Sequence, residues 1–132
     1  MKTIEVTAAI IRNKGQILIC QRPAHKNCGL LWEFPGGKIE AGETGEQCVI
    51  RECQEELGIT LSVEQKLTDI TYEYADRIVH LHFYLCNIAK GILEQKEHNA
   101  LEWITLGQVE QYEFCPADKE MIKSGVFNKL LL

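Results

Sequence analysis

Acidic side chains are concentrated in one short segment of this 132-residue chain. Residues 40–58 contain six Glu and one Arg, so this segment accounts for the whole formal net charge of −5. A helix over residues 44–58 would place Glu52, Glu55 and Glu56 within one turn, beside an apolar face. Like charges at this spacing repel, and anions near a helix C-terminus oppose its dipole. Clustered carboxylates suit Mg²⁺ or Mn²⁺, so a metal site and a solvated acidic face are about equally favoured by the residues alone.

Local signals mark both ends of this helix. Thr44 and Gln47 form the Thr-x-x-Gln pattern of a capping box, which predicts that the helix begins at Thr44. Gly58 fits the left-handed position that follows a helix, and apolar Ile59 comes next. The carboxylates are therefore expected to be carried by a helix with defined ends.

Other elements are expected on both sides of the helix. Pro35 and the glycine pair that follows it predict a break in regular structure. Alternation of side-chain character over 78–88 has the period of two of a strand. Strands before and after a central helix, with helices near the end, predict one α/β domain over residues 1–132 with helices on a mixed sheet. The expected strands are 6–11, 16–20, 61–74, 78–88 and 101–104, and the further helices are 107–112 and 117–124.

Composition excludes several classes of protein. The chain is 45% hydrophobic and 25% charged, as expected for a globular domain. An acidic balance argues against a nucleic-acid polymer as partner. The six cysteines are isolated from one another, without a C-x-x-C motif, so we expect reduced thiols and a cytoplasmic location. We expect no signal peptide, and no run approaches the roughly 20 apolar residues that span a bilayer, so no membrane association is expected.

One set of spacings resembles a known family. Gly37, Glu43 and the run Arg51 to Ile59 match the Nudix box, G-x5-E-x7-R-E-U-x-E-E-x-G-U, where U is a bulky apolar residue. Cys53 stands at one U position, where it packs as a small hydrophobe and leaves the polar positions intact. The match fixes seven polar or glycine positions at set spacing, which makes it a specific signal.

Similarity extends over nearly the whole chain. Segments 6–11, 18–23 and 31–38 resemble the MutT branch of the Nudix superfamily, and segments 77–82, 97–103 and 116–118 resemble the bacterial CTP pyrophosphohydrolases of that branch. The resemblance implies an α/β/α Nudix sandwich with a mixed central sheet. It also implies hydrolysis of a nucleoside triphosphate to the monophosphate and pyrophosphate, with Mg²⁺, or Mn²⁺, as the cofactor.

The resemblance also implies roles for individual residues. Glu52 is the favoured general base or water-orienting group, with Arg51 holding its carboxylate and Glu55 beside it. Glu43 is either a group that supports the ligands or an acid that precedes the helix cap. Glu97 is either a further ligand or an exposed loop acid. The implied metal ligands are the Gly37 carbonyl and the side chains of Glu52, Glu55, Glu56 and Glu97.

Substrate contacts are implied in the same way. Arg22 and Lys38 are expected to neutralise phosphates. Asp118 stands where the MutT branch has an Asn that reads the base. If ionised it only accepts hydrogen bonds, which suits a cytosine amino group, whereas a protonated Asp118 would also permit an oxidised purine. Phe34 is expected to stack on the base, and Arg77 matches the pocket edge or is simply a turn residue. Tyr74 and Phe83 are either stacking groups or core aromatics.

Several alternatives stay open. The nearest is an 8-oxo-dGTP diphosphatase, and a non-catalytic nucleotide-binding regulator is an alternative of another class, disfavoured by the complete set of box carboxylates. His80 and His82 lie on one strand face and could bind zinc, but no third ligand is evident from their spacing, so packed or pocket-lining histidines are favoured. We expect a small-molecule nucleotide as the partner and either a monomer or a homodimer. Two Mg²⁺ ions would nearly cancel the acidic charge, so the acidity excludes polyanions only when no metal is bound.

Overall fold

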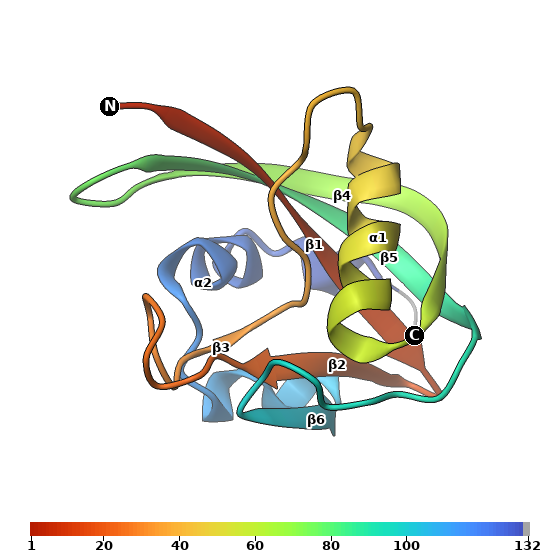
Figure 1. Ribbon diagram of the computed structural model, residues 1–132. Helices are drawn as coiled ribbons and strands as arrows, with labels where there is room; N and C mark the ends of the chain where they lie inside the picture. Colours follow the sequence, from red (N-terminus) through yellow and green to blue (C-terminus); the bar gives the residue numbers. More distant parts are fainter. Residues whose placement is uncertain (131–132) are drawn as a thin grey trace.

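A mixed sheet of six strands forms the centre of the molecule. In the computed structural model, which describes residues 1–130, the strand order is β3-β2-β1-β5-β4, and β6 pairs with β2. Strands β1 and β5 are parallel, and the other pairs are antiparallel. The expected mixed sheet is confirmed (Figure 1). The strands are β1 Thr3–Asn13, β2 Gln16–Gln21, β3 Trp32–Glu33, β4 Thr60–Glu73, β5 Ile78–Lys90 and β6 Ala100–Ile104.

The helix that carries the carboxylates ends where the sequence predicts. Helix α1 spans Gly45–Leu57, and the Thr44 side chain accepts a hydrogen bond from the backbone N–H of Gln47, whose own side chain accepts from the N–H of Thr44. Gly58 has φ 70°, the left-handed conformation that a glycine adopts without a Cβ penalty. These local interactions fix the start and end of α1 and hence the direction of its acidic face.

The structure corrects one expected helix, confirms the last one and adds two short elements that the sequence did not predict. The helix expected at 107–112 is a 3-10 helix, η1 Leu106–Gln111, as is common for so short a connecting segment. The last expected helix is α2 Pro116–Lys123, with Pro116 in its first turn, and a second 3-10 helix follows it, η2 Val126–Lys129. The chain also pairs with β2 at Trp32 and Glu33, just before the predicted break, and forms β3 there.

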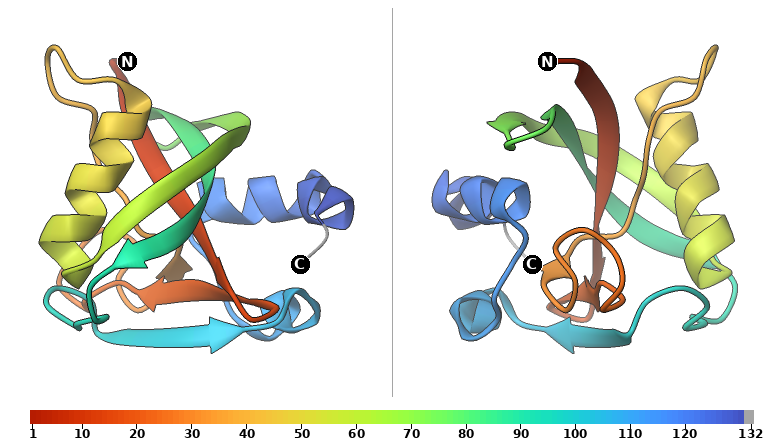
Figure 2. Two further views of the ribbon diagram at one scale, coloured as in Figure 1. Left: turned by 90° about the vertical axis from the view of Figure 1, so that its right-hand side faces the viewer. Right: turned by 60° about the vertical axis from the view of Figure 1, so that its left-hand side comes forward.

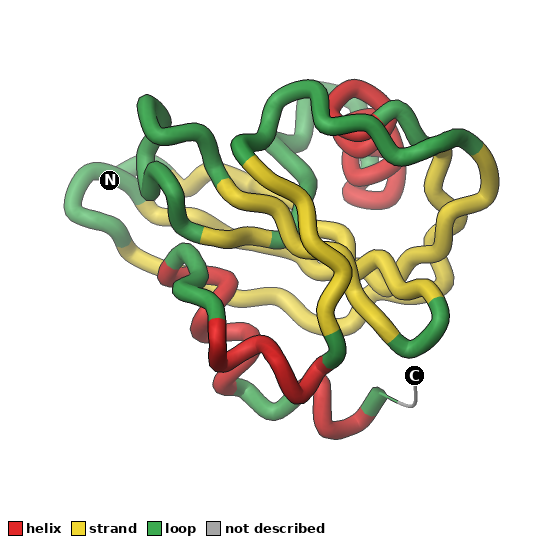
Figure 3. Tube along the Cα trace, turned by 90° about the horizontal axis from the view of Figure 1, so that it is seen from below, coloured by secondary structure: helices red, strands yellow, loops and turns green. Residues whose placement is uncertain are grey.

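Two hydrophobic cores lie on opposite faces of the sheet because side chains alternate along each strand. Ala9 and Ile11 of β1 pack with the apolar face of α1. Ala8 and Ile10 pack with residues of η1, α2 and η2. Figure 2 shows α1 and α2 on opposite sides of the strands, and Figure 3 shows the other helical segments gathered away from α1. The implied arrangement, with helices on both faces of the sheet, is therefore present.

No helix within residues 1–130 is long and apolar enough to cross a membrane.

Candidate active site

The acidic face of α1 divides into an exposed and a buried part. Val49, Cys53 and Leu57 are buried against the sheet, as the apolar face predicts. Glu55 is half exposed, whereas only 10% of the Glu56 side chain is exposed. Glu56 therefore faces the interior beside the apolar surface, and its carboxylate is removed from bulk water.

Arg51 lies at the centre of the carboxylates and not at their edge. Its Nε and Nη2 donate to the two oxygens of Glu43, at 2.7 and 3.0 Å. Its Nη1 donates to Glu52 at 2.9 Å and to Glu55 at 3.0 Å. The hydrogen bonds from Arg51 to Glu43, together with the one from the backbone N–H of Glu40, lower the pKa of Glu43 to about 2. One guanidinium thus orients three carboxylates, and Glu43 supports the cluster through Arg51.

Glu56 belongs to a second set of contacts, which is formed with His98 and Glu33 and does not include Arg51. Burial raises the pKa of Glu56 well above its usual range, and the neighbouring carboxylates of Glu52, Glu33 and Glu97 add to the effect. His98 Nε2 lies 3.4 Å from Glu56 and 3.2 Å from Glu33. A site that places several carboxylates this close together is complementary to a cation.

Glu33 and His98 are the site residues that the sequence did not single out. Arg22 Nη1 donates to Glu33 at 2.9 Å, so an Arg22–Glu33–His98–Glu56 chain of contacts runs along the wall of the cavity. His98 Nδ1 is buried and has no hydrogen-bond partner among the residues that the structure describes. Both residues lie in segments that resemble the family, but neither stands at a position of the Nudix box, so the sequence pattern assigned them no role.

The donor set fits a hard divalent cation. Every candidate ligand offers oxygen, which Mg²⁺ and Mn²⁺ prefer over nitrogen or sulfur. The Gly37 carbonyl accepts from the backbone N–H of Thr7 at 2.8 Å, and the Thr7 hydroxyl and the Cys48 thiol donate to it more weakly, at 3.3 and 3.4 Å. A metal bound to this oxygen would replace those two longer contacts. A Cβ at position 37 would overlap the Glu52 carboxylate, so with any residue other than glycine here the end of the Glu52 side chain would have to move.

A cavity of about 850 Å³ joins the acidic cluster to the expected substrate contacts. This size falls within the usual range of small-molecule sites. Glu97 is an exposed loop acid within electrostatic reach of Glu56, and Lys38 is also exposed. Arg51 and Glu55 are not among the residues that line the cavity: Arg51 contacts Glu52, which does line it, and Glu55 contacts Arg51. The cavity is lined by the predicted residues Arg22, Phe34, Gly37, Lys38, Glu52, Glu56, Arg77, Glu97 and Asp118.

Asp118 lies at the first turn of α2 and is 5% exposed. The backbone N–H of Phe34 donates to its Oδ1 at 3.2 Å. Burial, together with the nearby charge of Glu33, raises the pKa of Asp118 to about 8. At neutral pH its carboxyl group is mostly protonated, so it offers one donor as well as an acceptor.

The aromatic residues divide between cavity wall and core. Phe34 is 3% exposed, and its ring stacks on Phe114 with ring centroids 5.4 Å apart, so the ring belongs to the core. Phe34 contacts Asp118 through its backbone N–H. Phe83 is fully buried, which makes it a core aromatic. Tyr74 is half-buried in the cavity wall, and the Arg77 guanidinium lies 4.4 Å above its ring centroid. Tyr74 and Arg77 thus form one continuous part of the cavity lining.

Comparison with known proteins agrees with this geometry. The family model described as NUDIX domain matches residues 6–124. The chain is 42% identical over 124 residues to the CTP pyrophosphohydrolase of Escherichia coli K12, covering 94% of this chain and 92% of that protein. It is 40% identical over 123 residues to the 8-oxo-dGTP diphosphatase of the same strain, covering 92% and 95%.

Solved structures give the same result. The solution structure of the E. coli ORF135 protein superposes with a TM-score of 0.82 at 40% identity, covering 98% of this chain and 92% of that chain. The MutT protein of Methanosarcina mazei Go1, at 24% identity, shares the fold with a TM-score of 0.85, covering 96% and 94%. Nudix hydrolases generally use divalent metal ions, in agreement with the oxygen donors described above. The chain belongs to the Nudix hydrolase family.

Proposed function

We propose that this protein is a Mg²⁺-dependent nucleoside triphosphate pyrophosphohydrolase, which converts a (d)NTP and water to the (d)NMP and pyrophosphate. The observation that carries the proposal is that one cavity is lined both by the carboxylates of Glu52 and Glu56 and by the buried Asp118. The first pair suits a metal-bound polyphosphate, and the last suits hydrogen bonds to a base.

Glu52, Glu55 and Glu56, with the Gly37 carbonyl and Glu97, are the proposed ligands for Mg²⁺, with Mn²⁺ as a substitute. When bound, the metal polarises the phosphate oxygens and lowers the pKa of a coordinated water. The Arg22–Glu33–His98 contacts keep Glu56 in place from behind. The half-exposed Glu55 and the exposed Glu97 can adjust to the incoming ion without repacking of the core.

Glu52 is the proposed general base or water-orienting group. Its carboxylate accepts a hydrogen bond from Arg51 Nη1 and occupies the space that a Cβ at position 37 would fill. A base held this way takes a proton from water as that water attacks phosphorus in line with the leaving group. Lys38 and Arg22 are the proposed phosphate contacts. Arg22 already pairs with Glu33, so the exposed Lys38 supplies the more available charge.

The proposed substrate class is CTP, dCTP or a modified pyrimidine dNTP. It is supported by the 42% identity to the E. coli CTP pyrophosphohydrolase. A protonated Asp118 presents a donor and an acceptor side by side, which matches N3 and N4 of cytosine. Arg77 and Tyr74 line the same cavity, and Phe34 holds Asp118 through its backbone.

An 8-oxo-dGTP diphosphatase is the second candidate. The protonated Asp118 favours it too, because a carboxyl group that donates and accepts also fits the oxo and imide groups of an oxidised purine. The 40% identity to the E. coli 8-oxo-dGTP diphosphatase supports this candidate about as strongly as the first.

The deciding experiment is a nucleotide panel with Mg²⁺, in which CTP, dCTP, 5-methyl-dCTP and 8-oxo-dGTP are compared by kcat/KM. Products are separated as pyrophosphate or orthophosphate. We expect pyrophosphate from every substrate and the highest kcat/KM with a pyrimidine. A preference above about tenfold for 8-oxo-dGTP over every pyrimidine would select the second candidate. Absence of turnover with all four, but with measurable binding, would instead identify a nucleotide-binding regulator.

The remaining parts of the proposal concern the setting of the reaction. A small-molecule nucleotide is the proposed partner, and the six free cysteines support a reducing, cytoplasmic compartment. The choice between monomer and homodimer stays a prediction, which sedimentation of the purified chain would decide.

A further inference from the structure

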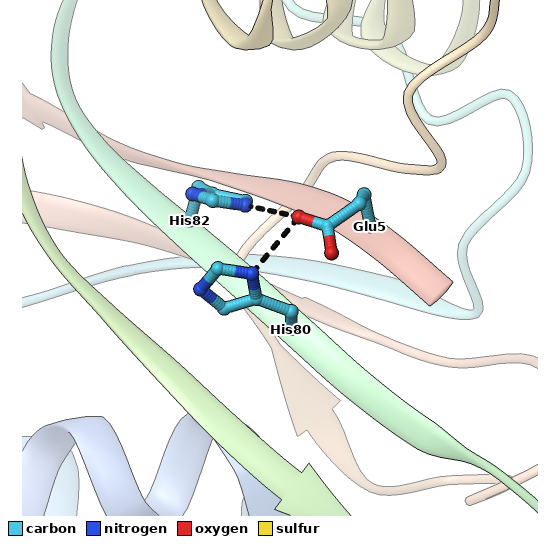
Figure 4. Close-up of side chains that lie close together, drawn as sticks. All are labelled: Glu5, His80 and His82. Atoms are coloured by element: carbon cyan, nitrogen blue, oxygen red, sulfur yellow. Dashed lines mark hydrogen bonds and ion pairs between the residues drawn. The ribbon is translucent and has the colours of Figure 1, made fainter. Parts of the chain in front are cut away.

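Three side chains from the parallel strands β1 and β5 meet on the face of the sheet against which α1 packs. The pairing of β1 with β5 sets Glu5 opposite His80 and Thr7 opposite His82, so Glu5 and both histidines lie on one face. Glu5 Oε1 lies 2.9 Å from His80 Nδ1 and 2.8 Å from His82 Nε2. Figure 4 shows the two rings converging on the Glu5 carboxylate. We call Glu5, His80 and His82 the histidine cluster.

Glu5, which lies 75 residues before His80 in the chain, is the third potential ligand that the spacing of the two histidines did not reveal. The three potential ligand atoms all lie within 4.8 Å of one another. Tetrahedral zinc with bonds of about 2.0–2.1 Å needs donor atoms about 3.3 Å apart. The separations from Glu5 are only slightly shorter than this, and its side chain is 47% exposed, so a small rotation of the carboxylate opens the site.

A further carboxylate fixes one of the two imidazoles. His80 Nε2 lies 2.5 Å from Asp69 Oδ2, on the neighbouring strand β4. His80 Nδ1 faces the Glu5 carboxylate, which only accepts hydrogen bonds, so the ring donates from both nitrogens and its pKa is raised. Zinc must replace the Nδ1 proton; the Nε2–H then stays on Asp69, and the Nδ1 lone pair is directed at the cluster. Metal-binding histidines in proteins almost always make this kind of hydrogen bond through their other nitrogen. The cluster thus has both a ligand set and an outer contact that orients it.

The histidine cluster is separate from the nucleotide cavity. Ile4 and Val6 of β1, and Val79 and Leu81 of β5, line that cavity. These four alternate with the cluster residues along the same strands and point to the opposite face of the sheet. Thr7, opposite His82 on the face of the cluster, also lines the cavity, but Glu5, His80 and His82 are not among its lining residues. The two sites also differ in chemistry, since the cavity offers carboxylate and carbonyl oxygens whereas the cluster offers two imidazole nitrogens and one carboxylate.

We propose that Glu5, His80 and His82 form a zinc site, with water as the fourth ligand. Two imidazoles with one carboxylate and an open position make a recurrent zinc ligand set, and imidazole discriminates against Mg²⁺. The site crosslinks β1 to β5 and, through Asp69, reaches β4. Zinc there stabilises this part of the sheet. The proposal is independent of the nucleotide that the enzyme hydrolyses.

Lys66 opposes the metal. Its Nζ lies 2.7 Å from His82 Nδ1, so the ammonium donates to that nitrogen and the ring proton of His82 sits on Nε2, facing Glu5. Zinc must displace that proton to Nδ1 and move the exposed Lys66 side chain away. Lys66 therefore weakens zinc binding without contributing a ligand, which gives the proposal a specific signature.

The test is a zinc titration of the full chain, followed by the ¹⁵N chemical shifts of the four histidine rings. It is done slightly above neutral pH, with Mg²⁺ in excess to occupy the oxygen ligands. We expect Nδ1 of His80 and Nε2 of His82 to move to shifts of metal-bound nitrogen at one equivalent of zinc. The exposed His25 serves as the internal reference, because its shifts should not change. Unchanged shifts of both His80 and His82 at zinc saturation would overturn the proposal.

Matched variants provide a second readout that does not depend on activity. His82→Gln should weaken zinc affinity at least about tenfold and remove the zinc-dependent rise in Tm, while His25→Gln leaves both as in the wild type. Asp69→Asn should weaken affinity by about 10–100-fold, as loss of an outer hydrogen bond does at other metal sites. Lys66→Gln should strengthen it, by up to about tenfold, because a positive charge near the ion is removed. Equal affinity in all four variants would place the zinc elsewhere and contradict the site.

Discussion

The guanidinium of Arg51 contacts both carboxylate oxygens of Glu43, eight residues earlier in the chain. The fork geometry of the pair fixes the plane of the guanidinium, which leaves Nη1 free to hold Glu52 and Glu55. Glu43 thereby influences the proposed general base without contacting it. Glu43 orients Arg51, and Arg51 in turn orients Glu52, so a change in the shape of residue 51 should disturb Glu52 even if the positive charge is kept.

Arg51→Lys should lower kcat at least about tenfold although it keeps the charge. A lysine ammonium cannot make the paired contact with Glu43 and also reach Glu52, so the base loses its orientation. Steady-state kinetics with dCTP and Mg²⁺ measure the change. A circular dichroism spectrum like that of the wild type should accompany it. Full activity in this variant would show that the guanidinium does not position the site.

Glu52→Gln should lower kcat by about 10²–10⁴-fold, the usual contribution of a general base, and leave the fold intact. The amide keeps the size of the side chain but cannot take a proton from water. Glu46→Gln is the matched control, since Glu46 is exposed on the first turn of the same helix. Turnover within about twofold of the wild type in Glu52→Gln would refute the proposed role.

Gly37→Ala tests the close approach of the loop to α1. The added methyl group would overlap the Glu52 carboxylate and displace it, so we expect kcat to fall by about 10²-fold. At Gly107 a Cβ would meet no atom closer than 3.9 Å, so Gly107→Ala should retain wild-type kinetics. Equal kinetics in the two variants would argue against the steric constraint at Gly37.

Asp118→Asn should change how stability depends on pH. The folded pKa of about 8 lies above the ordinary value of 3.8, so below about pH 4 the carboxyl group is neutral in both states and contributes no difference. Between about pH 4 and 8 the unfolded chain releases the proton while the folded protein retains it, so the free energy of unfolding falls as pH rises, and it levels off above pH 8. Asparagine has no such proton, so the variant should gain stability relative to the wild type across that range, by a few kcal/mol.

Urea unfolding of both proteins at several pH values between 4 and 9 measures this difference. Asp76→Asn is the control, because that side chain is 74% exposed and should give a much smaller pH-dependent change. A stability difference between Asp118→Asn and the wild type that is the same at every pH would contradict the raised pKa.

Local sequence signals determined where the helix that carries the carboxylates starts and ends. The capping box of Thr44 and the left-handed Gly58 each depend on residues within a few positions, so the start and end of α1 were predictable. The same is true of the helical spacing that brings Glu52, Glu55 and Glu56 together. The six-residue 3-10 helix η1 was not predicted as such, because over so short a segment the pattern of an α-helix and that of a 3-10 helix are hard to tell apart.

Tertiary structure alone decided the contacts between distant segments. Glu33 meets His98 across 65 residues, and the Phe34 amide meets Asp118 across 84. Glu5 completes the histidine cluster only because β1 and β5 pair in parallel with Glu5 opposite His80. Strand register and the burial that raises the pKa of Asp118 both depend on how the two cores pack on the sheet, and no short stretch of sequence contains that information. The sequence by itself therefore determined the family and the helical spacing of the proposed metal ligands on α1, whereas the fold decided which other side chains share the cavity with them.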